Sequence, residues 1–274
     1  MKRGGEPGRN DQKLQDLVVE LQRVDDGIDT KKLKEIISYG SKVVPYLEDI
    51  LRRALQKGVA RKLKTPQNNS DWLVVVQAFY LLAHLRAEDS LDLVLEFLSQ
   101  KQEILDYWLH DLLTDDVWEV IFYLGQNQLN KLQAFVLNPN HNIFARLAIC
   151  TALVQIGLHI ESKKDQVIAI FKKVLDLENE ETDFIGLVVS ELLDLNEEAL
   201  RPALLRALEK NDVWSGIISP IEVNRSYASK HARKLNPLDI FERYKLFNQY
   251  PCFAKSPAAK TPQKIKLRKL HNLL

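Results

Sequence analysis

Residues 138–148 read Asn-Pro-Asn-His-Asn-Ile-Phe-Ala-Arg-Leu-Ala, and they give the clearest indication of the fold. A short polar turn leads into an apolar run of small and branched residues, and Arg146 falls inside that run at a position that is expected to be buried. Residues 151–157 then close the unit at Gly157. Similar leucine-rich units restart after about forty residues, which is the signature of a repeat built from helices.

Helical periodicity is strong in several windows. Residues 71–85 place apolar side chains at helical spacing behind a polar start that can cap a helix, namely Trp72, Val75, Val76, Phe79, Leu82 and Ala83. The pattern predicts helices at 12–24, 30–39, 42–57, 71–86, 89–99, 103–113, 115–124, 127–137, 142–157, 164–177, 182–194, 197–210, 220–234 and 237–248. Each apolar stripe needs a neighbouring helix, and the short gaps favour antiparallel neighbours.

The fold class is therefore predicted to be all-α, a superhelix (solenoid) of antiparallel helix pairs. The repeat marks Gly40, Leu85, Gly125, Gly157 and Leu195 are unevenly spaced, which fits the HEAT and armadillo classes better than the fixed-period tetratricopeptide class.

The chain resembles HEAT-repeat proteins over residues 30–210. A proline early in a first helix and an arginine in a second helix are features of that class, and Pro45, Pro202 and Arg146 match them.

A narrower resemblance rests on Asp71-Trp72 with Leu81-Leu82-Ala83, and on Tyr107-Trp108 with Leu112-Leu113-Thr114. This pattern is similar to that of a family of uncharacterised bacterial HEAT-like proteins. Some of those proteins end in a cysteine-rich zinc tail like that of the SecA translocation ATPase. The end of this chain has only Cys252, so the resemblance implies no zinc site here.

Composition predicts a soluble protein of the cytoplasm. The chain has 274 residues, 46% of them apolar, and only two cysteines, which we expect to be reduced thiols. No apolar run reaches the length of a membrane helix, and the polar start lacks a signal peptide. We expect residues 1–11 to be disordered, 12–250 to form the solenoid and 251–274 to be a flexible basic tail.

Charge is distributed unevenly along the chain. Residues 222–274 hold 12 Lys and Arg against three acids, a net of +9, whereas the rest carries −8. The basic end is either an arm for an anionic partner, a segment that associates with the acidic body, or a solubilising tail. The candidate tail site is Lys264, Lys266, Arg268 and Lys269. A candidate basic patch consists of Arg52, Arg53, Lys57, Arg61, Lys62 and Lys64, and its alternative is a solvated helix end.

Catalytic and metal sites are not expected. The six histidines show no zinc-site spacing, and no glycine-rich phosphate loop follows a strand, so we predict no metal and no cofactor. One acidic cluster, Asp111, Asp115, Asp116 and Glu119, lies among Trp108 and Trp118. It allows an acid/base cleft like that of HEAT-like DNA glycosylases, but acids at a helix start beside core tryptophans explain it more simply.

The leading functional expectation is a non-catalytic scaffold that binds a protein partner in the groove lined by the second helices of its pairs. The alternative is a nucleic-acid-associated protein that uses the basic tail and patch, and would show strong salt dependence. A DNA glycosylase is the third hypothesis.

Overall fold

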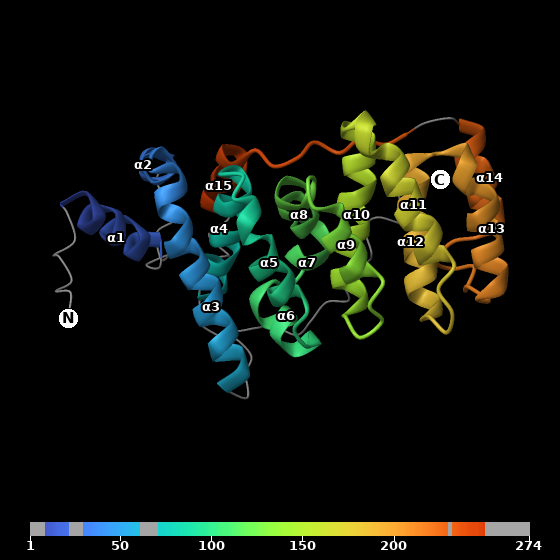
Figure 1. The fold of residues 1–274 in the computed structure, drawn as a ribbon, viewed down its shortest axis with the longest axis horizontal. Helices are drawn as coiled ribbons and strands as arrows, with labels where there is room; N and C mark the ends of the chain where they lie inside the picture. Colours follow the sequence, from blue (N-terminus) through green and yellow to red (C-terminus); the bar gives the residue numbers. More distant parts are fainter. Residues whose placement is uncertain (1–8, 22–29, 61–70, 230–231, 250–274) are drawn as a thin grey trace.

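The computed structural model describes residues 9–21, 30–60, 71–229 and 232–249, and every regular element in these ranges is helical (Figure 1). The α-helices are α1 (Arg9–Leu21), α2 (Thr30–Ser38), α3 (Val44–Ala60), α4 (Asp71–His84), α5 (Leu91–Leu98), α6 (Gln102–Trp108), α7 (Leu112–Asp115), α8 (Val117–Gly125), α9 (Leu129–Val136), α10 (Ile143–His159), α11 (Lys164–Leu175), α12 (Thr182–Leu195), α13 (Arg201–Lys210), α14 (Pro220–Ser229) and α15 (Ile240–Gln249). The predicted all-α fold is confirmed.

Helix pairs repeat along the stack. Single 3-10 turns lead into α3, α5, α11 and α13, and they span Gly40–Val43, Glu88–Ser90, Glu161–Lys163 and Glu198–Leu200. Pro202 lies in the first turn of α13, where its missing amide hydrogen costs no helical bond. Each of these helices is followed, directly or after the short helices α6 and α7, by the second helix of its pair.

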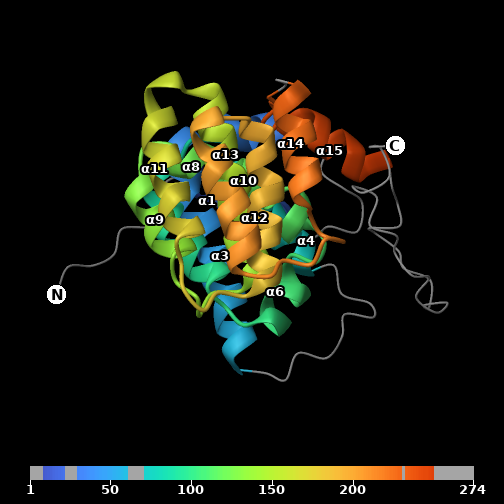
Figure 2. The same cartoon turned by 90° about the vertical axis from the view of Figure 1, so that its right-hand side faces the viewer.

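The pairs form two layers. In the central layer, α4, α8, α10 and α12 contact one another in succession, and α14 packs on α12. In the outer layer, α3 contacts α5, and α11 contacts both α9 and α13. Figure 2 shows α9 and α11 on one side of α10 and α12, and α15 on the other. The short insertions α6 and α7 pack on the central layer, against α4 and against α8 and α10.

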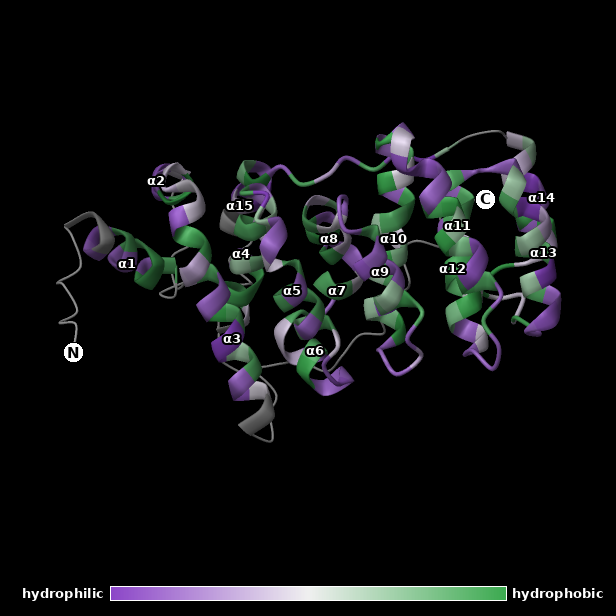
Figure 3. Ribbon diagram, in the orientation of Figure 1, coloured by the Kyte–Doolittle hydropathy of each residue, from purple (hydrophilic) through white to green (hydrophobic). Residues whose placement is uncertain are grey.

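Burial distinguishes the two layers. Every residue from Ala148 to Gly157 of α10 is buried, as is every residue from Leu73 to Ala83 of α4, because these helices have neighbours on all sides. Outer helices such as α9 carry both hydrophilic and hydrophobic residues, whereas α10 is mostly hydrophobic (Figure 3).

Arg146 is fully buried, as its place in the apolar run within residues 138–148 predicts. Its guanidinium pairs with both carboxylate oxygens of Glu180 at 2.9 and 2.6 Å, and its Nε donates to the carbonyl of Val136 at 2.9 Å. The same guanidinium lies 3.7 Å from the centre of the Phe184 ring. One side chain thus joins α10 to the end of α9 and to the turn before α12.

Several predicted boundaries are wrong. The single helix expected at 103–113 is two helices, because His110 has a φ of +47° that no right-handed helix can contain. The helix expected at 220–234 ends at Ser229, and residues 232–239 are extended. At the other end, α1 begins at Arg9, inside the segment expected to be disordered.

The largest departure is the place of the last helix. We expected 237–248 to stack beside the preceding helix as a final pair, but α15 packs on α2 and α4 instead. Figure 1 shows the connection running back from α14 along the stack to α15 beside α4. The basic tail predicted at 251–274, with Cys252, lies outside the described residues.

Candidate functional site

The face of the central layer carries a segment of the chain's own C-terminal part, residues 232–249, which we call the strap. It consists of the extended residues 232–239 and of α15. The strap crosses α12 and α10 and ends on α4, α8 and α2, so it runs against the order of the stack. The helices of the central layer therefore hold a segment of the chain itself.

The extended half of the strap is held through its backbone. On α10, the Gln155 side chain donates to the carbonyl of Arg233 at 3.2 Å and accepts from the amide of Leu235 at 2.9 Å. The Nε2 atom of His159 lies 2.9 Å from the carbonyl of Leu235, and the amide of Arg233 donates to the carbonyl of Asp194 at 2.8 Å. Because these contacts are to main-chain atoms, they hold an extended peptide with little regard to its side chains.

The helical half of the strap is held through charge. Arg243 of α15 reaches the Oδ1 atom of Asp116 at 2.7 Å and the Oε1 atom of Glu119 at 2.6 Å. Both acids are buried at the start of α8, whereas the Arg243 side chain keeps 26% of its surface exposed. Two carboxylates therefore share one guanidinium at the junction of strap and stack.

Two tyrosines extend this network onto α4. The Tyr80 hydroxyl donates to the Oδ2 atom of Asp116 at 2.9 Å, and the Tyr244 hydroxyl lies 3.3 Å from the Oε1 atom of the buried Gln77. The Oε2 atom of Glu119 is buried and has no hydrogen-bond partner among the described residues. The network thus keeps one acceptor without a partner next to the guanidinium.

Burial dominates the acid–base behaviour of the network. It raises the pKa of Glu119 to about 7, although Arg243 opposes the shift. Burial also raises the pKa of Asp116, against the opposing effects of Arg243 and of the Tyr80 hydrogen bond. A pair of acids with one cation is therefore close to taking up a proton near neutral pH.

The structure divides the acidic cluster that the sequence singled out. Asp111 and Asp115 are exposed, while Asp116 and Glu119 are buried. Trp108 and Trp118 are buried in the core, as the simpler interpretation predicts. That interpretation missed the role of the two buried acids, which are ion-paired with a strap residue more than a hundred positions along the chain.

Sequence reasoning also missed Gln77, Tyr80, Arg243 and Tyr244 as members of one site. A local signal exists for Gln77 alone, because it is a polar residue within the apolar stretch 73–83. The other three are ordinary members of amphipathic patterns, and only the return of the chain brings them together.

The candidate basic patch lies only partly within the described residues. Arg52 and Arg53 on α3 pair with Glu48 at 3.0 Å and Asp49 at 2.5 Å, one helical turn before them. Lys57 lies on the same helix, while Arg61, Lys62 and Lys64 lie outside the described residues, as do Lys264, Lys266, Arg268 and Lys269 of the tail. Two of the six cations are thus neutralised by acids that precede the patch.

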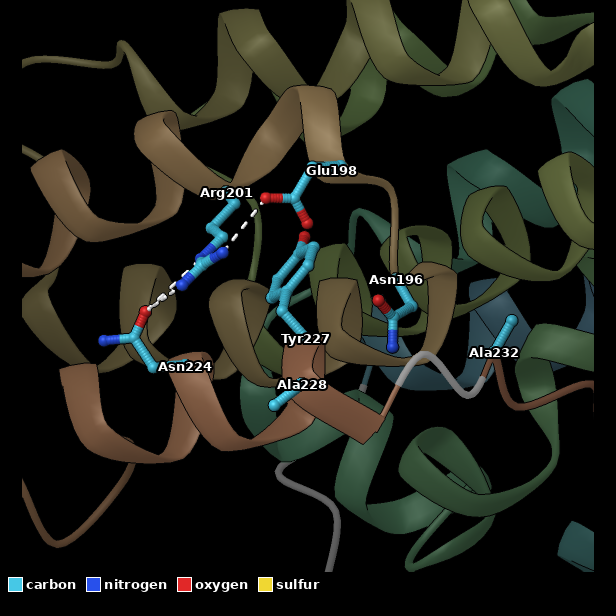
Figure 4. A pocket seen from close by; sticks show the side chains of 7 residues that line it. All are labelled: Asn196, Glu198, Arg201, Asn224, Tyr227, Ala228 and Ala232. Atoms are coloured by element: carbon cyan, nitrogen blue, oxygen red, sulfur yellow. Dashed lines mark hydrogen bonds and ion pairs between the residues drawn. The ribbon is translucent and has the colours of Figure 1, made fainter.

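A separate hollow of about 600 Å³ lies where the chain leaves α14 for the strap (Figure 4). Its lining residues are Asn196, Glu198, Arg201, Asn224, Tyr227, Ala228 and Ala232. The Arg201 guanidinium donates to Glu198 at 3.0 Å and to Asn224 at 2.8 Å, so its charge is already engaged by the wall.

The part of the chain that the structure describes shows no sign of a metal site or of a membrane span. There, no three His, Cys, Asp or Glu side chains gather as metal ligands would. None of the helices in these ranges combines the length and apolar character needed to cross a membrane. Cys150 is a buried free thiol, and burial raises its pKa.

Comparisons with known proteins identify a family without assigning a role. A family model described as a protein of unknown function (DUF1186) matches residues 12–250. The search of curated proteins and the search of solved structures each found no match to the chain.

Proposed function

This chain belongs to the DUF1186 family, and from its geometry we propose that it is a non-catalytic scaffold that binds a protein partner on the central layer of its helix stack. We assign the stack to the HEAT type of α-solenoid. Its irregular pairs, the proline in the first turn of α13 and the buried Arg146 on a second helix support that assignment.

One observation carries the proposal: the central layer already holds a peptide in two ways. Gln155 and His159 bind the main chain of an extended segment, and the acids of α8 bind a helix through its arginine. Extended-segment and helix-in-groove binding are recurring modes by which proteins recognise peptides. A surface with both is suited to a protein ligand.

A non-enzymatic role is part of the proposal. Of the four acids that suggested a glycosylase-like cleft, Asp116 and Glu119 pair with Arg243, and Asp116 also accepts from Tyr80, which favours a structural and recognition role for these two. A cytoplasmic location is also proposed, since the free buried thiol of Cys150 suits a reducing compartment.

Affinity capture with the full chain tests the proposal. We expect one protein to be recovered in near-equal amount with and without nuclease. Zero-length cross-links should join it to Lys245 of the strap or to Lys34, which lies over the Phe241 ring of the strap. Lys131 and Lys172 of the outer layer serve as the internal comparison. Recovery that disappears with nuclease or at high salt would favour the nucleic-acid alternative. Cross-links confined to the outer layer would reject the central layer as the binding surface.

A further inference from the structure

We propose that α15 occupies an exchangeable site on α4 and α8, whose other ligand is a partner helix that presents an arginine followed directly by a tyrosine. This inference rests on the proposed scaffold function and names the chemistry of its partner. The site is the set Gln77, Tyr80, Asp116 and Glu119, which we call the arginine pocket.

The occupant shows what the pocket recognises. Ile240, Arg243 and Tyr244 lie at positions i, i+3 and i+4 of α15, on one helical face. Ile240 and Tyr244 are almost fully buried, and Arg243 enters between the two acids. An apolar anchor, a cation and a hydroxyl on one face are the minimum that a competing helix must copy.

The charge of the site requires a cation, and its burial favours arginine. Asp115 adds to the negative charge near Asp116, and the described residues offer the pair no cation in direct contact except Arg243. Two neighbouring carboxylates repel each other once the cation leaves, so the vacated site favours a positively charged side chain. The Nη2 atom of Arg243 makes both contacts, and a guanidinium is more weakly hydrated than an ammonium, so arginine suits a buried ion pair better than lysine.

The present occupant leaves one carboxylate oxygen of the site without a hydrogen bond among the described residues. Arg243 contacts the Oε1 atom of Glu119, while Oε2 is buried and has no partner among the described residues. A guanidinium seated slightly deeper could donate to both oxygens of this carboxylate. A partner arginine therefore has a hydrogen bond to gain over the one that α15 supplies.

The position of α15 in the chain makes exchange feasible. It is ten residues long, which is too short for an isolated helix to be stable, and it follows an extended segment rather than a stacked pair. The stack ends with α14, which packs on α12 and α13 without it. Release of α15 would thus open the pocket without separating any helix pair.

A peptide assay tests exchange without knowledge of the natural partner. The probe is a labelled peptide with the sequence of residues 232–249, and the receptors are the full-length wild type, Arg243→Ala and Lys245→Ala. Lys245 is the matched control because it pairs with Glu242 on the solvent side of α15. Fluorescence anisotropy measures binding, and circular dichroism verifies folding.

We expect the Arg243→Ala chain to bind the probe at least about tenfold more tightly than the wild type or Lys245→Ala, because its own strap competes less well. A probe carrying Arg243→Ala should bind that chain at least about tenfold more weakly than the native probe. Equal binding of the two probes, or no binding to the folded Arg243→Ala chain, would overturn the proposal.

Hydrogen exchange on the wild type gives a second, independent reading should Arg243→Ala not fold. Amides of α15 should exchange well before those of α8, because local release of the strap precedes global unfolding. Equal protection of α15 and α8 would overturn exchange. The peptide assay needs no natural partner. If the peptide assay fails and affinity capture succeeds, only the exchange of α15 is rejected. If the peptide assay succeeds and affinity capture fails, only the scaffold function is rejected.

Discussion

Replacement of Arg146 by methionine should destabilise the protein strongly. Arg146 and Glu180 have side-chain exposures of 0% and 4%, so their bidentate pair has little access to solvent. Methionine keeps an apolar stem against the Phe184 ring but removes the cation and the hydrogen bond to Val136. The buried carboxylate of Glu180 is then uncompensated.

The expected cost follows from that uncompensated charge. Removal of one partner of a buried ion pair costs about 3–5 kcal/mol, so we expect a loss of about 4 kcal/mol in the free energy of unfolding. For a domain of this size, that loss lowers the midpoint of thermal unfolding by about 8–16 °C. The double variant Arg146→Met with Glu180→Met should recover most of the loss, because it leaves no unpaired charge.

Chemical denaturation followed by circular dichroism measures these values, with Arg206→Met as the control on the exposed side of α13. The control should change the stability by less than about 0.5 kcal/mol. A loss below about 1 kcal/mol for Arg146→Met, or a double variant as unstable as the single one, would refute the reasoning.

The stability that the Arg146–Glu180 pair contributes should depend on pH. Burial acts to raise the pKa of Glu180, but hydrogen bonds from Arg146 and from the Glu181 amide outweigh it and hold the pKa below its usual range. The pair therefore stabilises the wild type above the unfolded-state pKa of about 4.3, and this contribution is lost as the pH falls through the lower folded value. In Arg146→Met the unpaired acid takes up a proton readily, so the penalty should shrink in acid.

Three further outcomes are expected. Asn142→Ala should cost about 1 kcal/mol in denaturant melts, because the Asn142 side chain caps α10 by accepting from the amides of Phe144 and Ala145; an unchanged midpoint would contradict this role. Gly125→Ala should cost about 1–3 kcal/mol, since an added Cβ would lie 2.9 Å from a methyl carbon of the Leu132 side chain, and a neutral effect would mean that Leu132 moves freely. Burial, opposed by Arg243, raises the pKa of Glu119 to about 7, so stability should fall as the pH rises from about 4.5 to 7, and Glu119→Gln should flatten that slope; a persistent slope in the variant would assign it to another group.

The helices themselves could be predicted because their signals are local. The start of α4 at residue 71 and of α12 at residue 182 coincide with their predictions, and α10 begins one residue after its own. Caps, polar gaps and apolar spacing depend on residues within one or two turns, and they are read without knowledge of the partner helix. The burial of Arg146 could also be predicted, from its place in an apolar run.

The candidate site could not be predicted, because its contacts join distant parts of the chain. Arg243 meets Glu119 across 124 positions, and Tyr244 meets Gln77 across 167. The amphipathic pattern of residues 237–248 predicts a helix with a buried face, but periodicity does not specify which surface covers that face. The excess of positive charge from residue 222 onwards did suggest, as one alternative, that the end of the chain associates with the acidic body.

The all-α repeat, its helix pairs and its buried arginine follow from the sequence, because they depend on local spacing and on the cost of exposing apolar stripes. Tertiary structure alone decided that the chain turns back after α14, that residues 232–239 stay extended and that α15 fills the arginine pocket. The physical reason is that two acids buried on α8 need a cation, and the three-dimensional path of the strap supplies it from the far end of the stack.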